Sequence, residues 1–87
     1  MALTATQQNY IAELDRQAKN ILSQGGESAL LMSLADKMAN IKLMLDVATK
    51  EELNRYCGQY EGFYRYMQMM ERLAMAAASG DLDSVLN

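Results

Sequence analysis

The chain has 87 residues, with 8 basic and 11 acidic side chains that give a formal charge of −3, and it lacks proline and histidine. This length fits one small domain with one core. The acidic balance and scattered cations disfavour nucleic-acid binding, which needs clustered positive charge. Without histidine the chain lacks the commonest general base and transition-metal ligand. We therefore expect a protein that is not an enzyme and has no catalytic residue, metal or cofactor.

The compartment is predicted from the first residues and from the longest apolar segment. The N-terminal residues lack the basic start and apolar run of a signal peptide. Residues 29–48 match a membrane span in length, but their four charges would cost about 10 kcal/mol in a bilayer. Cys57 is the only cysteine, so no internal disulfide can form. We expect a cytoplasmic protein with no membrane contact.

The first predicted helix covers residues 5–24. Thr4 or Thr6 precedes it, and either hydroxyl can accept a hydrogen bond from a free N–H at the helix start. Its apolar residues lie on one side, at positions 11, 14, 18 and 21. Such a helix packs on one neighbouring surface. Gly25 and Gly26 then end it, because glycine adopts the left-handed conformation that closes a helix.

The second predicted helix covers residues 28–47, and the stretch 29–48 carries two apolar arcs. The first comprises Leu31, Leu34, Ala35, Met38, Ile41, Leu45 and Ala48, and the second comprises Met32, Ala39 and Leu43. One neighbouring helix can cover one arc, so two arcs require two neighbours. We therefore expect this helix at the centre of the fold.

The run Thr49-Lys50-Glu51-Glu52 matches a capping box, in which Thr49 accepts from the N–H of Glu52 and the carboxylate of Glu52 reaches back to Thr49. It predicts a tight turn at 47–50. A continuous helix over 28–78 is the alternative, because no glycine or proline enforces the break.

The third predicted helix covers residues 50–78. Its apolar seam repeats at spacings of three and four, as in a coiled coil, at Leu53, Tyr56, Tyr60, Phe63, Met67, Met70, Ala74 and Ala77. Gly80 ends this helix, and residues 81–86 are predicted to form a short helical turn. The fold class is therefore all-α: an antiparallel three-helix bundle, made of a helical hairpin plus the N-terminal helix, with a short C-terminal turn.

The other side of the third helix is the candidate interface, formed by Gly58, Gly62, Tyr66, Met69 and Leu73. An interior glycine destabilises a helix by about 1 kcal/mol relative to alanine, and in return it permits close approach of a neighbouring backbone. That neighbour is either the first helix or a second copy of the chain. Because the second and third helices both show two apolar faces, we favour homo-oligomerisation.

The function predicted from these features is protein–protein interaction. We expect a small module that self-associates and binds an unknown protein partner, as an adaptor, an inhibitor or a subunit of a larger assembly such as a phage or secretion component. The alternative is a nucleic-acid-associated or transcription accessory protein, in which a dimer brings Arg65 and Arg72 together. Cys57 is interpreted as structural, because its helical neighbours supply neither a base nor a cation.

Overall fold

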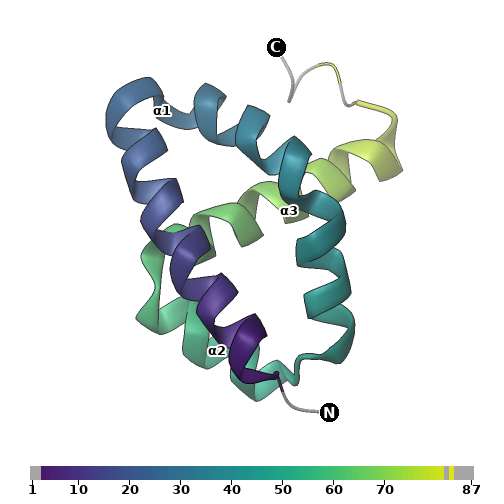
Figure 1. Ribbon diagram of the computed structural model, residues 1–87. Coiled ribbons are helices and arrows are strands. Elements are labelled where there is room, and N and C mark those ends of the chain that lie inside the picture. The colour runs from purple at the N-terminus through teal and green to yellow at the C-terminus, as the bar shows by residue number, and fades with distance from the viewer. Residues whose placement is uncertain (1–2, 82, 84–87) are drawn as a thin grey trace.

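The computed structural model describes residues 3–81 and 83, and it confirms the all-α prediction. The described chain forms α1 (Ala5–Val47), α2 (Lys50–Gln59) and α3 (Glu61–Ser79) (Figure 1). None of these helices combines the length and the apolar character needed to cross a membrane. The predicted turn over 81–86 lies outside the described residues except for Asp81 and Asp83.

Helix α1 contains both of the first two predicted helices. Thr4 caps its start: the Thr4 hydroxyl accepts from the N–H of Gln7, and the Gln7 side chain accepts from the N–H of Thr4. Gly26 interrupts the helical geometry with φ 71° and ψ −162°, a conformation open almost only to glycine. The chain reverses there, so the first half of α1 (5–25) and the second half of α1 (27–47) form two sides of an arch (Figure 1).

The predicted turn at 47–50 is confirmed. Thr49 accepts a hydrogen bond from the N–H of Glu52, and Glu52 accepts one from the N–H of Thr49. Ala48 and Thr49 are both extended, which separates α1 from α2. The alternative of one helix over 28–78 is therefore wrong.

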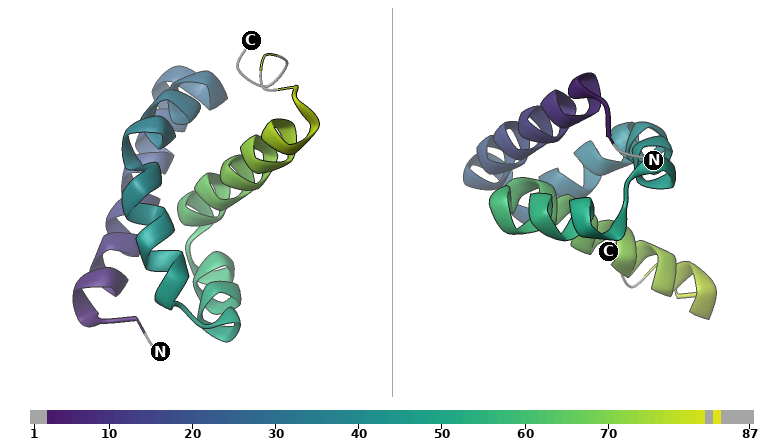
Figure 2. Two further views of the ribbon diagram at one scale, coloured as in Figure 1. Left: turned by 90° about the vertical axis from the view of Figure 1, so that its right-hand side faces the viewer. Right: turned by 90° about the horizontal axis from the view of Figure 1, so that it is seen from below.

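The prediction of one helix over 50–78 is also wrong, because the chain breaks at Tyr60. This residue has φ −121° and ψ 97° and serves at once as the last cap of α2 and the first cap of α3. Helix α3 therefore leaves the end of α2 in a new direction (Figure 2). The break frees the N–H groups at the start of α3, and one of them bonds to α1.

The core lies between the arch of α1 and the helix α3. Helix α3 packs mainly on α1, and α2 packs on α3. The buried core residues are Leu3, Ile11, Leu14, Ala18, Leu30, Leu34, Ile41, Met44, Tyr56, Phe63, Tyr66 and Met69. Both halves of α1 thus bury one side against the same partner helix.

Candidate protein-binding groove

The residues predicted as an interface between copies lie mostly inside a single copy. Gly62, Tyr66 and Met69 are buried and Leu73 is half-buried. Gly58 lies apart from them, exposed on α2, and a side chain there would meet nothing within 4 Å. The sequence predicted that either the first helix or a second copy packs on this face. In the structure, the chain's own α1 packs there.

Asp15 explains the position of Gly62. The N–H of Gly62, at the start of α3, donates to Asp15 Oδ1 over 2.7 Å, and Lys19 Nζ lies 3.2 Å from Asp15 Oδ2. Asp15 as a whole is only 8% exposed. A carboxylate at a helix N-terminus is favourable because it meets free N–H groups and the positive end of the helix dipole. A side chain of α1 thus caps α3, which has no cap from Tyr60.

Tyr66 fixes α3 to the other half of α1. Its side chain is fully buried, and its hydroxyl is hydrogen-bonded to that of Ser33 over 2.8 Å. Lys37 Nζ donates to the same Ser33 oxygen over 3.1 Å. Burial raises the pKa of the Tyr66 phenol. Tyr66 therefore acts in folding, with its polar end satisfied inside the molecule.

A groove of about 490 Å³ lies between α2, α3 and the end of α1. Its lining is Leu45, Lys50, Leu53, Asn54, Cys57, Tyr64, Met67, Gln68, Met70 and Glu71. Leu53, Met67 and Met70 belong to the apolar seam predicted for the third helix, and each is only half-buried. The chain therefore covers the predicted interface and leaves much of the predicted seam open.

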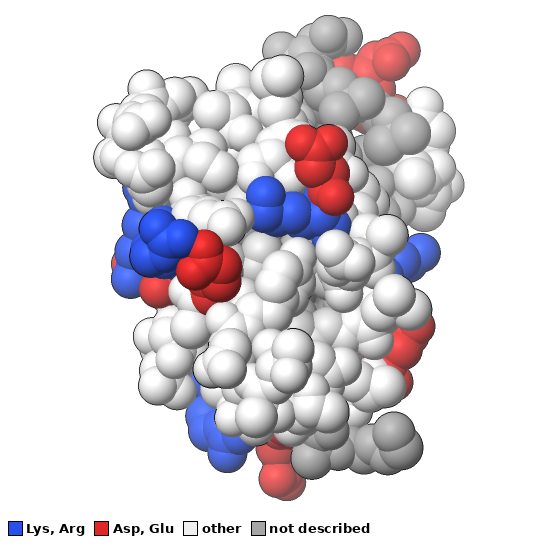
Figure 3. Space-filling view, viewed as in Figure 1, with Lys and Arg blue, Asp and Glu red and all other residues white. Residues whose placement is uncertain are grey.

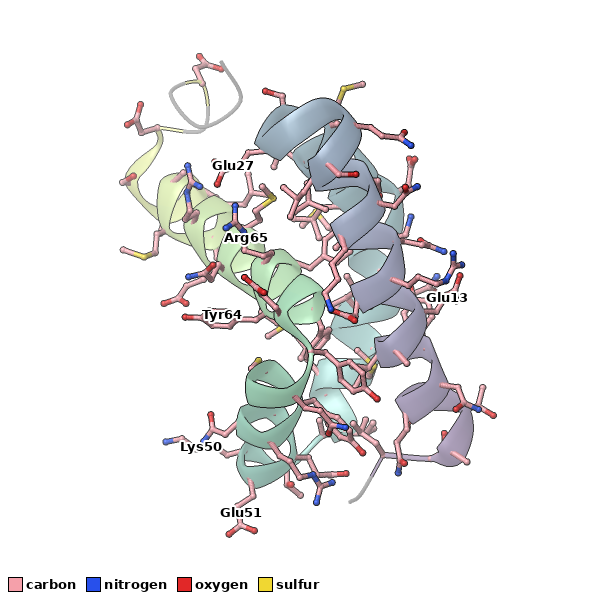
Figure 4. The ribbon with its side chains drawn as sticks, turned by 90° about the vertical axis from the view of Figure 1, so that its left-hand side faces the viewer. Glu13, Glu27, Lys50, Glu51, Tyr64 and Arg65 are labelled. Carbon is pink, nitrogen blue, oxygen red and sulfur yellow. The ribbon has the colours of Figure 1, made fainter. Side chains whose placement is uncertain are left out.

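The rim of the groove is polar and aromatic. Tyr64 is 44% exposed, and Figure 4 shows its ring and the Lys50 side chain projecting to the same side of the molecule, away from the first half of α1. Glu71 supplies an acidic group on the α3 side. Flexible methionine side chains inside a groove and a tyrosine at its rim are typical of surfaces that bind other proteins.

Cys57 lines the groove but is poorly suited to covalent chemistry. Burial raises the pKa of its thiol, so the reactive thiolate is scarce near neutral pH. The described residues also contain no group of three or more Cys, Asp or Glu side chains placed to hold a metal ion. The groove therefore offers apolar contact area for a binding partner.

The two arginines of the nucleic-acid alternative lie beside an acidic residue. Arg65 donates to Glu27 over 2.5 Å, and an Arg72 nitrogen lies 4.0 Å from the other Glu27 oxygen. Figure 4 shows Arg65 directed from α3 toward Glu27 on α1. The face in Figure 3 has isolated charges on a largely uncharged surface. No broad basic area for phosphates exists on that face.

Comparisons with protein-family models, with curated proteins and with solved structures found no match to this chain. The functional assignment therefore depends on the groove itself. Sequence reasoning missed the groove because it placed the seam in the core. The available signal was the presence of two apolar faces on the third predicted helix.

Proposed function

We propose that this chain is a non-catalytic protein–protein interaction module, built as an antiparallel helical hairpin closed by α3 and a short C-terminal turn. It binds a helix of a protein partner in the groove, as an adaptor, an inhibitor or a subunit of a larger assembly. The observation that carries the proposal is the apolar lining of the groove, supplied by three helices and only partly covered by the chain.

The chemistry of the groove defines its occupant. Its walls are apolar, while Lys50 on α2 and Glu71 on α3 give its two sides opposite charge. An amphipathic helix places apolar side chains at i, i+3 or i+4, and i+7 along one face, which is the pattern that apolar grooves accept. The partner helix therefore carries a carboxylate that meets Lys50 and a cation that meets Glu71.

Fluorescently labelled amphipathic peptides of that pattern test the proposal on the full-length chain. We expect them to bind more tightly than peptides of the same composition in scrambled order, and to slow the reaction of Cys57 with a thiol reagent. Met67→Glu places a charge in the groove, and we expect it to weaken binding at least about tenfold. Anisotropy measures the affinity.

Met75→Glu is the matched control, because Met75 is 66% exposed on α3 and lies outside the groove lining. It should bind the peptides as the wild type does. Equal binding of ordered and scrambled peptides would overturn the proposal, and so would binding that survives Met67→Glu. Circular dichroism of each variant checks that the helices remain intact.

A further inference from the structure

A second hollow, of about 390 Å³, lies on α3 next to the groove. Gln68 and Glu71 line both the hollow and the groove, so the two share one wall. The other residues that line the hollow are Arg65, Met69, Arg72 and Met75 on α3 and Glu27 on α1. A chain that binds in the groove can therefore pass over Gln68 and enter the hollow.

The hollow differs from the groove in its positive charge. Arg65 and Arg72 are seven residues apart on α3, about two helical turns, so they lie on one side of the helix and about 10 Å apart along it. The groove has one cation, Lys50 on α2. A guanidinium group binds a carboxylate through two parallel N–H donors, which makes arginine the better ligand for that group. The hollow is thus suited to an acidic segment.

Most N–H donors of the two arginines have no acceptor among the residues that the structure describes. Arg65 donates to Glu27 over 2.5 Å, whereas Arg72 lies 4.0 Å from the same carboxylate, beyond hydrogen-bond distance. Each guanidinium group has five N–H donors. The side chain of Arg72 is 59% exposed, so a partner can reach these donors.

Glu27 occupies the position that a carboxylate of a partner would take. Its side chain is 60% exposed and lies within ion-pair distance of both arginines. Figure 4 shows Arg65 directed from α3 toward it. Exposed ion pairs are weak, because water competes for both charges. The hollow therefore contains its own replaceable competitor for an acidic ligand.

We propose that the binding site for the partner extends from the groove into this hollow, where an acidic segment of the partner displaces Glu27 and pairs with Arg65 and Arg72. The inference rests on the proposed function, since the helix in the groove brings this segment to the hollow. The partner cation that meets Glu71 is favoured at the C-terminal end of its helix. The acidic segment therefore follows that end.

Two peptides that share one amphipathic helix test the inference on the full-length chain. The first ends in a short segment with two glutamates, and the second has glutamines in their place. We expect the glutamates to raise the affinity about three- to tenfold. Arg72→Gln should remove most of this gain and leave the affinity for the glutamine peptide unchanged. Anisotropy measures the affinities, and circular dichroism checks that each variant is folded. No gain from the glutamates, or the same gain in Arg72→Gln, would overturn the proposal.

Glu27→Gln tests the displacement directly, because it should strengthen binding. The variant frees both arginines, so we expect the gain from the glutamates to rise by a further factor of about two or more. Asp36→Asn is the matched control: it removes the same charge from an exposed position on α1 outside both linings. An equal increase in the two variants would show an effect of net charge alone and would refute the displacement of Glu27.

The two peptides also separate this inference from the proposed function. If the glutamine peptide binds and the glutamates add nothing, the extension into the hollow is wrong and the groove remains the binding site. If neither peptide binds, the proposed function is wrong, and this inference fails with it.

Discussion

Two glycines four residues apart in the sequence have opposite surroundings. A Cβ added at Gly62 would lie 2.8 Å from the Cα of Asp15 and nearer still to its carbonyl oxygen, whereas one at Gly58 would meet nothing within 4 Å. Backbone atoms cannot yield as the end of a flexible side chain can. Gly62 is therefore required by close approach of α3 to α1, and Gly58 is required by nothing in its surroundings.

The effect of alanine at these positions should differ in sign. We expect Gly62→Ala to lower the free energy of unfolding by about 1–3 kcal/mol, because the new methyl group forces α3 away from Asp15. Gly58→Ala should raise it by up to about 1 kcal/mol, because alanine favours helix over glycine. Urea unfolding followed by circular dichroism measures both. A Gly62→Ala protein as stable as the wild type would refute the contact.

Tyr66 and Met69 show that sequence alone does not reveal which apolar face of α3 is buried. Both lie on a face as apolar as the seam containing Met67 and Met70, and no local property separates the two faces. The choice depends on Asp15 and Ser33, which hold α3 by bonds across 47 and 33 residues of sequence. Sequence periodicity could identify two apolar faces on this segment but could not assign α1 to one of them.

At the scale of elements, the start of α2 is a junction between distant parts of the chain. Glu52 Oε2 accepts from the N–H of Leu3 over 3.0 Å, and Glu52 Oε1 accepts from the N–H of Thr49 over 3.2 Å. These two backbone bonds lower the pKa of Glu52. One carboxylate therefore completes the cap of α2 and holds the residue that precedes α1.

The Glu52 carboxylate should make the free energy of unfolding depend on pH. Because its pKa is lowered on folding, its contribution is present above the ordinary glutamate value of about 4.3 and is lost as the pH falls through the folded-state pKa. We expect Glu52→Gln to be less stable than the wild type near pH 7 and to lose less stability on acidification. Urea midpoints near pH 7 and near pH 3 measure this. Glu51→Gln, at an exposed neighbour, should keep the wild-type dependence.

The ends of helices were predictable where their signals are local. The capping boxes at Thr4 and Thr49 and the reversal at Gly26 each depend on residues within one turn. The break at Tyr60 does not, because the bond that stabilises the start of α3 comes from Asp15 on another helix. The sequence there contains no proline and has the pattern of a continuous helix. The contact with Asp15 therefore determines the position of the break.

On the scale of the whole molecule, the chain has more apolar helical surface than one copy covers. One face of α3 and one face of each half of α1 form the core, together with Tyr56 of α2 and Leu3. The groove and an exposed apolar stripe on α1 from Met32 to Leu43 remain, on different sides of the molecule. The sequence could indicate this excess, because two predicted helices each show two apolar faces. Which apolar surface remains uncovered depends on how α3 packs.

The two uncovered surfaces should act independently. We expect Leu43→Glu to bind the amphipathic peptides with wild-type affinity, since Leu43 and Leu45 face opposite ways on α1. Anisotropy measures this affinity. Weakened peptide binding by Leu43→Glu would show that the two surfaces are coupled.

The bond from Gly62 to Asp15 also affects how the chain folds during synthesis. A nascent protein leaves the ribosome from its N-terminus, so α1 emerges while its Asp15 carboxylate and Ser33 hydroxyl still face no other helix. Both groups gain their partners only after Gly62 and Tyr66 have followed. The apolar inner side of the α1 arch therefore lacks its partner helix until α3 has been synthesised.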